Sequence, residues 1–162
     1  MADIRTLWSD LGGDWRLAGP SFDVDEGLET AVIVSLFTDR VADAGETGIE
    51  STGRRGWWGD LDAEEIWDGW PIGSKLWLRS RTTITGVAAR KGSTTVQIED
   101  DIREALQPFL DRKIATRLDV TVVRAGIERI AASIVMYRGD ELLLALEFAD
   151  LWRGIVVSAP TG

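Results

Sequence analysis

The stretch LDVTVVRAGIERIAASIVMYRGDELLLALEF, residues 118–148, decides the fold class of this 162-residue chain. Residues 118–122 alternate apolar and polar side chains, which is the two-residue period of a half-buried strand. Two apolar runs follow, Ile130–Tyr137 and Leu142–Phe148, and the Arg138–Asp140 segment between them is typical of a hairpin turn. Three neighbouring strands with short links predict a C-terminal antiparallel β-meander.

Upstream of the meander the apolar spacing becomes helical. Thr94–Leu110 repeats its apolar residues at helical intervals, with Pro108 expected to kink or end the helix. A second helical run, Leu28–Phe37, is apolar nearly all round, which indicates deep burial. Asp23 and Glu26 have the spacing of a capping box and Asp25 is a second cap candidate, so we expect this second helix to start within residues 23–26.

The remaining elements complete an α+β fold class. Residues Ile4–Phe22 predict an N-terminal β-hairpin, with Gly12-Gly13 supplying its turn. Ser74 is placed to cap a short helix, Lys75–Arg79. The predicted fold therefore has an N-terminal β-hairpin, two main helices with a long Trp-rich loop, and the C-terminal meander. We expect one domain over residues 1–150 and a C-terminal arm or edge strand over residues 151–162.

Composition narrows the function classes. The chain has no cysteine and no histidine, which excludes disulfides, thiolate catalysis, Cys-based metal sites and a Ser-His-Asp triad. Its net charge of −9 and pI near 4.5 disfavour nucleic acid as a partner, because phosphate would be repelled. No apolar run is long enough to span a membrane. A chain without histidine or cysteine is a poor enzyme candidate, because any catalysis would have to use carboxylates, lysine, Tyr137 or an oxygen-bound cation. We therefore predict that the protein is not an enzyme and that it binds neither nucleic acid nor membrane.

The tryptophan-rich segment, residues 43–71, holds four of the eight tryptophans. A long loop inside a compact domain is commonly functional, and tryptophan and arginine are enriched at interface hot spots. The alternative is that the tryptophans belong to the core and the arginines are merely solvated; the residues alone favour neither reading. The residues that we predict at a protein interface are Arg54, Arg55, Trp57, Trp58, Asp60, Trp67, Trp70 and Trp152.

The same segment also carries a group of carboxylates: Asp60, Asp62, Glu64, Glu65 and Asp68. Paired carboxylates beside aromatic rings are what a glycosidase requires. With 27 acidic residues in the chain, a solvated acidic loop is the favoured reading. A sugar-binding module using Trp67 and Trp70 is a further alternative, and the spacing does not fit a calcium-binding EF-hand loop.

Three motifs, in this order, resemble one known family. Leu28–Arg40 resembles its first helix, and Arg55–Asp60 (RGWWGD) and Gly73–Leu78 (GSKLWL) resemble two further motifs of the family. Together they resemble the Mu-like baseplate protein family of contractile-tailed phages, over roughly residues 4–150. The stretch Thr82–Gly92 departs from the family pattern, and the tail after Trp152 lies outside the resemblance.

The resemblance implies a structural subunit of a contractile tail baseplate, without cofactor or catalytic residues, present in several copies around the tail axis. The implied partners are other wedge subunits, the tail sheath and the central hub or spike proteins. The implied role is assembly in the baseplate wedge and help in seeding the sheath. The implied location is the tail of the virion or of a tail-like particle, assembled in the host bacterial cytoplasm. A tail-associated cell-wall glycosidase is the alternative function.

Overall fold

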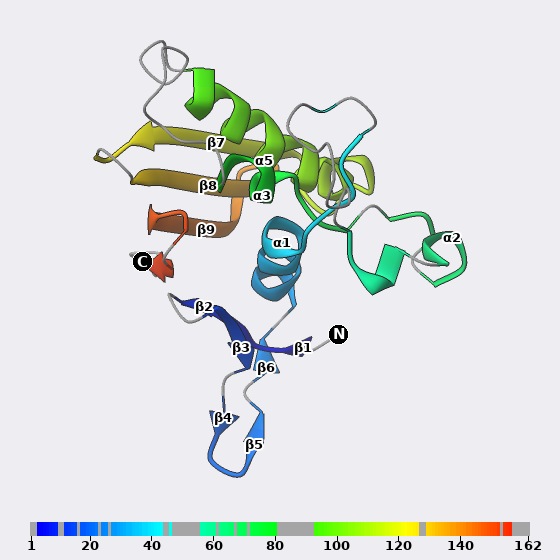
Figure 1. Cartoon of the computed structure of the whole chain (residues 1–162). Coiled ribbons are helices and arrows are strands. Elements are labelled where there is room, and N and C mark those ends of the chain that lie inside the picture. The colour runs from blue at the N-terminus through cyan, green and yellow to red at the C-terminus, as the bar shows by residue number, and fades with distance from the viewer. Residues whose placement is uncertain are drawn as a thin grey trace.

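The computed structural model describes residues 3–9, 12–15, 17–22, 24–25, 27–43, 46, 56–60, 62–66, 68–70, 72–80, 93–126, 129–152 and 154–156. Their arrangement is α+β, as predicted (Figure 1). The helices are α1 (Leu28–Phe37), the 3-10 turn η1 (Trp58–Asp60), α2 (Ala63–Ile66), α3 (Leu76–Ser80) and α5 (Ser93–Asp111). The strands are β1 (Asp3–Ile4), β2 (Thr6–Ser9), β3 (Gly12–Trp15), β4 (Leu17–Ala18), β5 (Ser21–Phe22), β6 (Val24–Asp25), β7 (Arg117–Arg124), β8 (Ile130–Arg138), β9 (Glu141–Asp150) and β10 (Gly154–Val156).

The C-terminal sheet confirms the predicted meander. Its strand order is β10-β9-β8-β7, with every neighbouring pair antiparallel. β7 and β8 pair in an unbroken register from Arg117 opposite Tyr137 to Arg124 opposite Ile130. Gly139 makes the β8–β9 turn at a φ of 62°, a backbone conformation that glycine adopts without a steric penalty.

The core lies between this sheet and the two long helices. Figure 1 shows α5 running across the sheet and α1 between the sheet and the small N-terminal strands. Alternate residues of β8, from Ile130 to Met136, are buried, as expected for a strand with one covered face. The other main core side chains are Val32, Leu36, Leu76, Ile98, Ile102, Ala105, Leu106, Phe109, Leu118, Val120, Leu146 and Phe148.

The long helix matches its prediction, whereas the predicted start of α1 was wrong. Thr94–Leu110 was expected and α5 spans Ser93–Asp111, with Pro108 inside it. α1 begins at Leu28, after Gly27 in a left-handed conformation, and no side chain caps it. The reason is that Val24–Asp25 forms β6, paired with β1, so its backbone is already extended.

Near the N-terminus β2 pairs antiparallel with β3, from Thr6 opposite Trp15 to Ser9 opposite Gly12. Gly12 and Gly13 therefore lie inside β3, and the prediction that they supply the turn was wrong because their backbones pair with Ser9 and Trp8. Toward the C-terminus β10 pairs with β9 at the sheet edge. The division of the chain near residue 150 stays a prediction. Within the described part of the chain, no helix is both long and apolar enough to span a membrane.

The tryptophan-rich segment is less irregular than predicted. Its described residues include η1 and α2, so the expectation of one long loop was wrong for these two short elements. Asp62 and Asp68, on either side of α2, have positive φ values of 58° and 53°. Aspartate tolerates this conformation better than most residues because its short side chain hydrogen-bonds locally.

Candidate functional site

Two of the three motif stretches are hydrogen-bonded to each other at the end of α1. We call this contact, between residues 36–40 and residues 73–77, the clamp. Ser74 N–H donates to Thr38 O at 2.9 Å, and Arg40 N–H donates back to Ser74 O at 3.0 Å. The Ser74 hydroxyl donates to Leu36 O and accepts from Leu76 N–H at 3.2 Å, so it caps α3 as predicted. These bonds satisfy backbone groups at the end of one helix and the start of another, which is where orphan donors and acceptors arise.

Gly73 allows this close approach. Its φ is +108°, and a Cβ there would lie 2.9 Å from Thr38 O and 3.1 Å from Arg40 N. Both neighbours are backbone atoms that cannot move without breaking the clamp. The glycine that opens the GSKLWL stretch is therefore explained by contact with the 28–40 stretch.

Trp77 closes the clamp from the other side. Its indole Nε1–H donates to Arg40 O at 2.9 Å, and only 7% of the residue is exposed. A buried tryptophan needs such a partner for its one polar hydrogen. Leu76 is buried in the core beside it, so both residues face inward as predicted.

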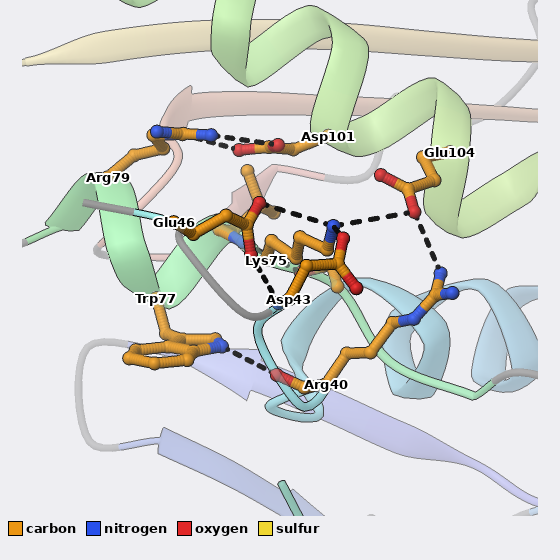
Figure 2. Close-up of polar contacts among 10 residues, drawn as sticks. Arg40, Asp43, Glu46, Lys75, Trp77, Arg79, Asp101 and Glu104 are labelled. Atoms are coloured by element: carbon orange, nitrogen blue, oxygen red, sulfur yellow. Dashed lines mark hydrogen bonds and ion pairs between the residues drawn. The ribbon is translucent and has the colours of Figure 1, made fainter. Parts of the chain in front are cut away.

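Lys75 lies at the centre of a charge network above the clamp (Figure 2). Its ammonium group is 2.5 Å from Asp43 Oδ2, 3.2 Å from Glu46 Oε1 and 3.8 Å from Glu104 Oε1. Burial of the amine lowers its pKa, but the hydrogen bonds to Asp43 and Glu46 and the charge of Glu104 outweigh burial, so the pKa of Lys75 stands above its ordinary value. Arg40 joins the network through Glu104 at 3.2 Å.

A second ion pair fixes α3 against α5. Arg79 Nε donates to Asp101 Oδ2 at 2.8 Å and Arg79 Nη2 to Asp101 Oδ1 at 3.3 Å, a two-point pairing (Figure 2). Burial raises the pKa of Asp101 and outweighs the opposing effect of Arg79. These ion pairs therefore join residues near the end of α1, the side chains of Asp43 and Glu46, helix α3 and helix α5.

The described part of the third motif stretch is organised by contacts between its own aromatic rings. Trp57 and Trp58 pack on each other with ring centroids 5.2 Å apart and planes at 59°. A Cβ on Gly59 would lie 2.3 Å from the Trp57 ring, so this glycine makes room for the ring to fold back. Trp58 is 77% exposed, the most exposed of the large apolar side chains that the structure describes. This turn therefore displays an indole on the surface.

Two of the other predicted interface residues, Trp70 and Trp152, pack against the core of this chain. Trp70 is half-buried: its ring meets Phe109 edge-on at 5.2 Å, and the Arg112 guanidinium lies 4.7 Å from its centroid. Trp152 is half-buried against the core, and Asp60 ends η1. Arg54, Arg55 and Trp67 lie outside the described residues. The assignment of these residues to an interface stays a prediction.

The carboxylates beside the tryptophans are exposed where described: Asp62, Glu64, Glu65 and Asp68. Asp68 pairs with Arg112 at 3.5 Å. Among the described residues, no group of three or more acidic side chains is arranged to hold a metal ion.

Sequence reasoning missed the network around Lys75. Asp101 was the most informative signal, because it lies between Ile98 and Ile102 at the apolar spacing of α5, where a carboxylate needs a partner. Lys75 and Arg79 gave a second signal, since both belong to a short helix expected to face the core. Their partners lie far away in sequence and could not be identified by spacing.

Comparison with known proteins identifies the family. The model of the family described as phage protein GP46 matches residues 28–142, from the first residue of α1 into β9. The chain is 40% identical over 144 residues to the Mu-like prophage FluMu protein gp46 of Haemophilus influenzae, covering 86% of this chain and 90% of that protein. It is 42% identical over 86 residues to baseplate protein gp46 of Escherichia phage Mu, covering 52% of this chain and 56% of that protein.

The matched region contains all three motif stretches, the clamp, the charge network and most of the core. The model covers well over half of the chain, and one relative aligns over nearly its whole length. This protein therefore belongs to the phage protein GP46 family, a family of Mu-like phage baseplate proteins.

Proposed function

We propose that this protein is a structural subunit of a contractile tail baseplate, in a phage or a tail-like particle, and acts by assembly rather than catalysis. We place it in the wedge, in contact with other wedge subunits, the sheath and the central hub or spike proteins, where it helps to seed the sheath. Family membership supports the baseplate role. The exposed indole of Trp58 is the structural observation that carries the assembly role.

The three motif stretches differ in whether their residues are bonded within this chain. The 28–40 and 73–78 stretches are accounted for by the clamp, since their backbone and side-chain groups bond each other. The described part of the third stretch, residues 56–60, makes a turn that leaves Trp58 in water, where a large apolar side chain contributes little to folding. Burial against a neighbouring subunit is the arrangement that uses such a side chain.

We propose an interface centred on Trp58 and Trp57, with Arg54, Arg55 and Asp60 around them. Trp67, Trp70 and Trp152 complete the proposed set. Of these, Trp70 and Trp152 contact this chain's own core, so their share of the interface would be limited to their exposed edges. The turn fits an apolar pocket on a partner whose rim carries acidic groups, because Arg54 and Arg55 outnumber Asp60 beside the two tryptophans.

The experiment deletes the gene in the producing strain and examines the particles by negative-stain electron microscopy. We expect tails without sheath or baseplate, restored by the wild-type gene. Complementation with Trp58→Ala should lower the yield of sheathed tails at least tenfold, while the purified variant keeps its thermal unfolding midpoint. Trp15→Ala is the matched control, because Trp15 is also an exposed tryptophan but lies outside the family-matched residues.

Three outcomes would contradict the proposal. Normal sheathed tails in the deletion strain would remove the structural role, and such tails failing only at cell-wall penetration would favour the glycosidase alternative. Equal losses with Trp58→Ala and Trp15→Ala would show that the interface is not centred on Trp58. Unfolding of Trp58→Ala would show that this indole serves the fold.

A further inference from the structure

Arg103 reaches around the edge of the C-terminal sheet. β7 is the last strand of the sheet among the residues that the structure describes. Arg103, on α5, donates from Nη1 to Leu118 O at 3.3 Å and from Nη2 to Val120 O at 3.1 Å. Glu99, one turn earlier on α5, holds the guanidinium at 2.8 Å and 3.2 Å. One side chain therefore occupies two successive carbonyl groups of the same strand.

These two carbonyls are the ones that a further strand would need. In an antiparallel pair, alternate residues turn their backbone groups toward the partner and the others turn away. Ala125 N–H donates to Arg129 O just beyond the end of β7, in the register of the β7–β8 pair, so the odd-numbered residues of β7 turn their backbone groups toward β8. The alternation places residues 118, 120 and 122 with their backbone groups directed away from β8. The Arg103 nitrogens lie at the hydrogen-bonding distance where an incoming N–H would have to lie.

The sequence of β7 makes protection of this edge necessary. Val120–Val123 is an unbroken β-branched run, which has high propensity to pair with another strand. Antiparallel pairing with β7 of a second copy, centred on Val120, places Asp119 opposite Thr121 and Arg117 opposite Val123. No two like charges face each other in that register, so the side chains of β7 offer little resistance to self-pairing.

We propose that Arg103, held by Glu99, caps the β7 edge and keeps it from pairing with β7 of a second copy of this chain. The cap works by occupying the Leu118 and Val120 carbonyls with a charged group, which an incoming strand would have to displace from both carbonyls. Glu99 is the positioning residue, because it fixes the guanidinium at the edge. The cap is formed only by contacts between α5 and β7, and it does not require the proposed baseplate role.

The test compares the self-association of full-length variants by sedimentation velocity over a concentration series. Arg103→Ala should lower the apparent dissociation constant for dimer formation at least tenfold relative to wild type. Arg103→Lys keeps the charge but loses the planar two-point donor, so it should give a smaller shift, about threefold. Arg112→Ala is the matched control, because Arg112 is similarly exposed, at 40% against 43%, and contacts Asp68 and Trp70 away from β7.

A second variant and a second measurement identify the edge that pairs. Val122→Pro removes an N–H directed away from β8, so it should block a β7–β7 pairing without breaking the meander. Arg103→Ala with Val122→Pro should return to the wild-type association. Hydrogen exchange of Arg103→Ala should slow at the Leu118, Val120 and Val122 amides as the protein concentration rises.

The proposal is overturned if folded Arg103→Ala associates no more than Arg112→Ala. It is equally overturned if association occurs without protection of the β7 amides, or if Val122→Pro leaves it unchanged. Should Arg103→Ala not fold, Arg103→Lys and Glu99→Gln carry the test, and unchanged association in both would overturn the cap.

Discussion

The clamp and the Trp57–Trp58 turn are both made of motif stretches, yet they do opposite things with similar residues. In the clamp, Trp77 is buried and bonded to Arg40 O, and Gly73 lets two backbones approach. In the turn, Trp58 stands in water, and Gly59 makes room for a neighbouring ring rather than for a backbone. The motif stretches that resemble the family therefore include two kinds of residue. Some hold the subunit together, and others are exposed on its surface.

The largest loss of stability is expected for Gly73→Ala, which tests whether the clamp holds the subunit together. We expect it to lower the free energy of unfolding by about 3 kcal/mol, because it combines a positive φ with a Cβ that meets backbone atoms. Gly139→Ala has a positive φ of 62° but open space around the added Cβ, so it should cost about 1 kcal/mol. Urea unfolding measures both. Equal costs for the two variants would show that the contact with Thr38 and Arg40 is not what requires glycine.

Lys75→Met tests the charge network next to the clamp. We expect a loss of about 1–2 kcal/mol near neutral pH, below the cost of breaking a fully buried pair because Asp43 is largely exposed. Because the folded pKa of Lys75 is raised, its stabilisation is fully present below the unfolded value of 10.5 and is lost as pH rises through the folded pKa.

The stability difference between wild type and Lys75→Met should therefore shrink as pH rises above 10.5. Urea unfolding of both proteins near neutral pH and at about pH 11 measures this difference. Lys113→Met, an exposed lysine after α5, serves as the control. A difference that grows with pH would contradict the sign of the pKa shift.

Gly59→Ala probes the turn and should have the smallest effect on stability. The added Cβ would displace the Trp57 side chain rather than backbone, so we expect a change within about 1 kcal/mol. The exciton signal of the Trp57–Trp58 pair in circular dichroism should fall, because the rings lie only 5.2 Å apart in wild type. Trp58→Ala provides the reference spectrum without the pair. An unchanged spectrum in Gly59→Ala would mean that the ring does not depend on this glycine.

The regular elements could be predicted because their signals are local. β7 alternates over a two-residue period and α5 repeats its apolar residues at helical spacing, so each pattern is complete within the element. The prediction of the start of α1 was wrong because that start is not set locally. Asp23 and Glu26 carry a local capping signal, but pairing of Val24 with Ile4 overrides it through a contact twenty residues away in sequence (24 − 4).

The site could be predicted only in part. The motif stretches were found from their residues, and Ser74 was correctly expected to cap α3. Which tryptophan is buried and which is displayed could not be read from the sequence, since Trp58 and Trp77 are the same residue in similar glycine-containing stretches. The partners of Lys75 and Arg79 could not be predicted either, because each ion pair joins residues more than twenty positions apart in the sequence.

The sequence by itself determined the fold class, the meander and the long helix, because periodicity and turn residues act over a few neighbouring positions. It also determined the likeness to the baseplate family, because that likeness is carried by the order of residues within three short stretches. The tertiary structure alone decided that two of those stretches clamp each other, that Asp101 is buried, and that Arg103 reaches the β7 edge. Each of these depends on bringing distant segments within hydrogen-bonding distance, which burial of the shared core makes possible.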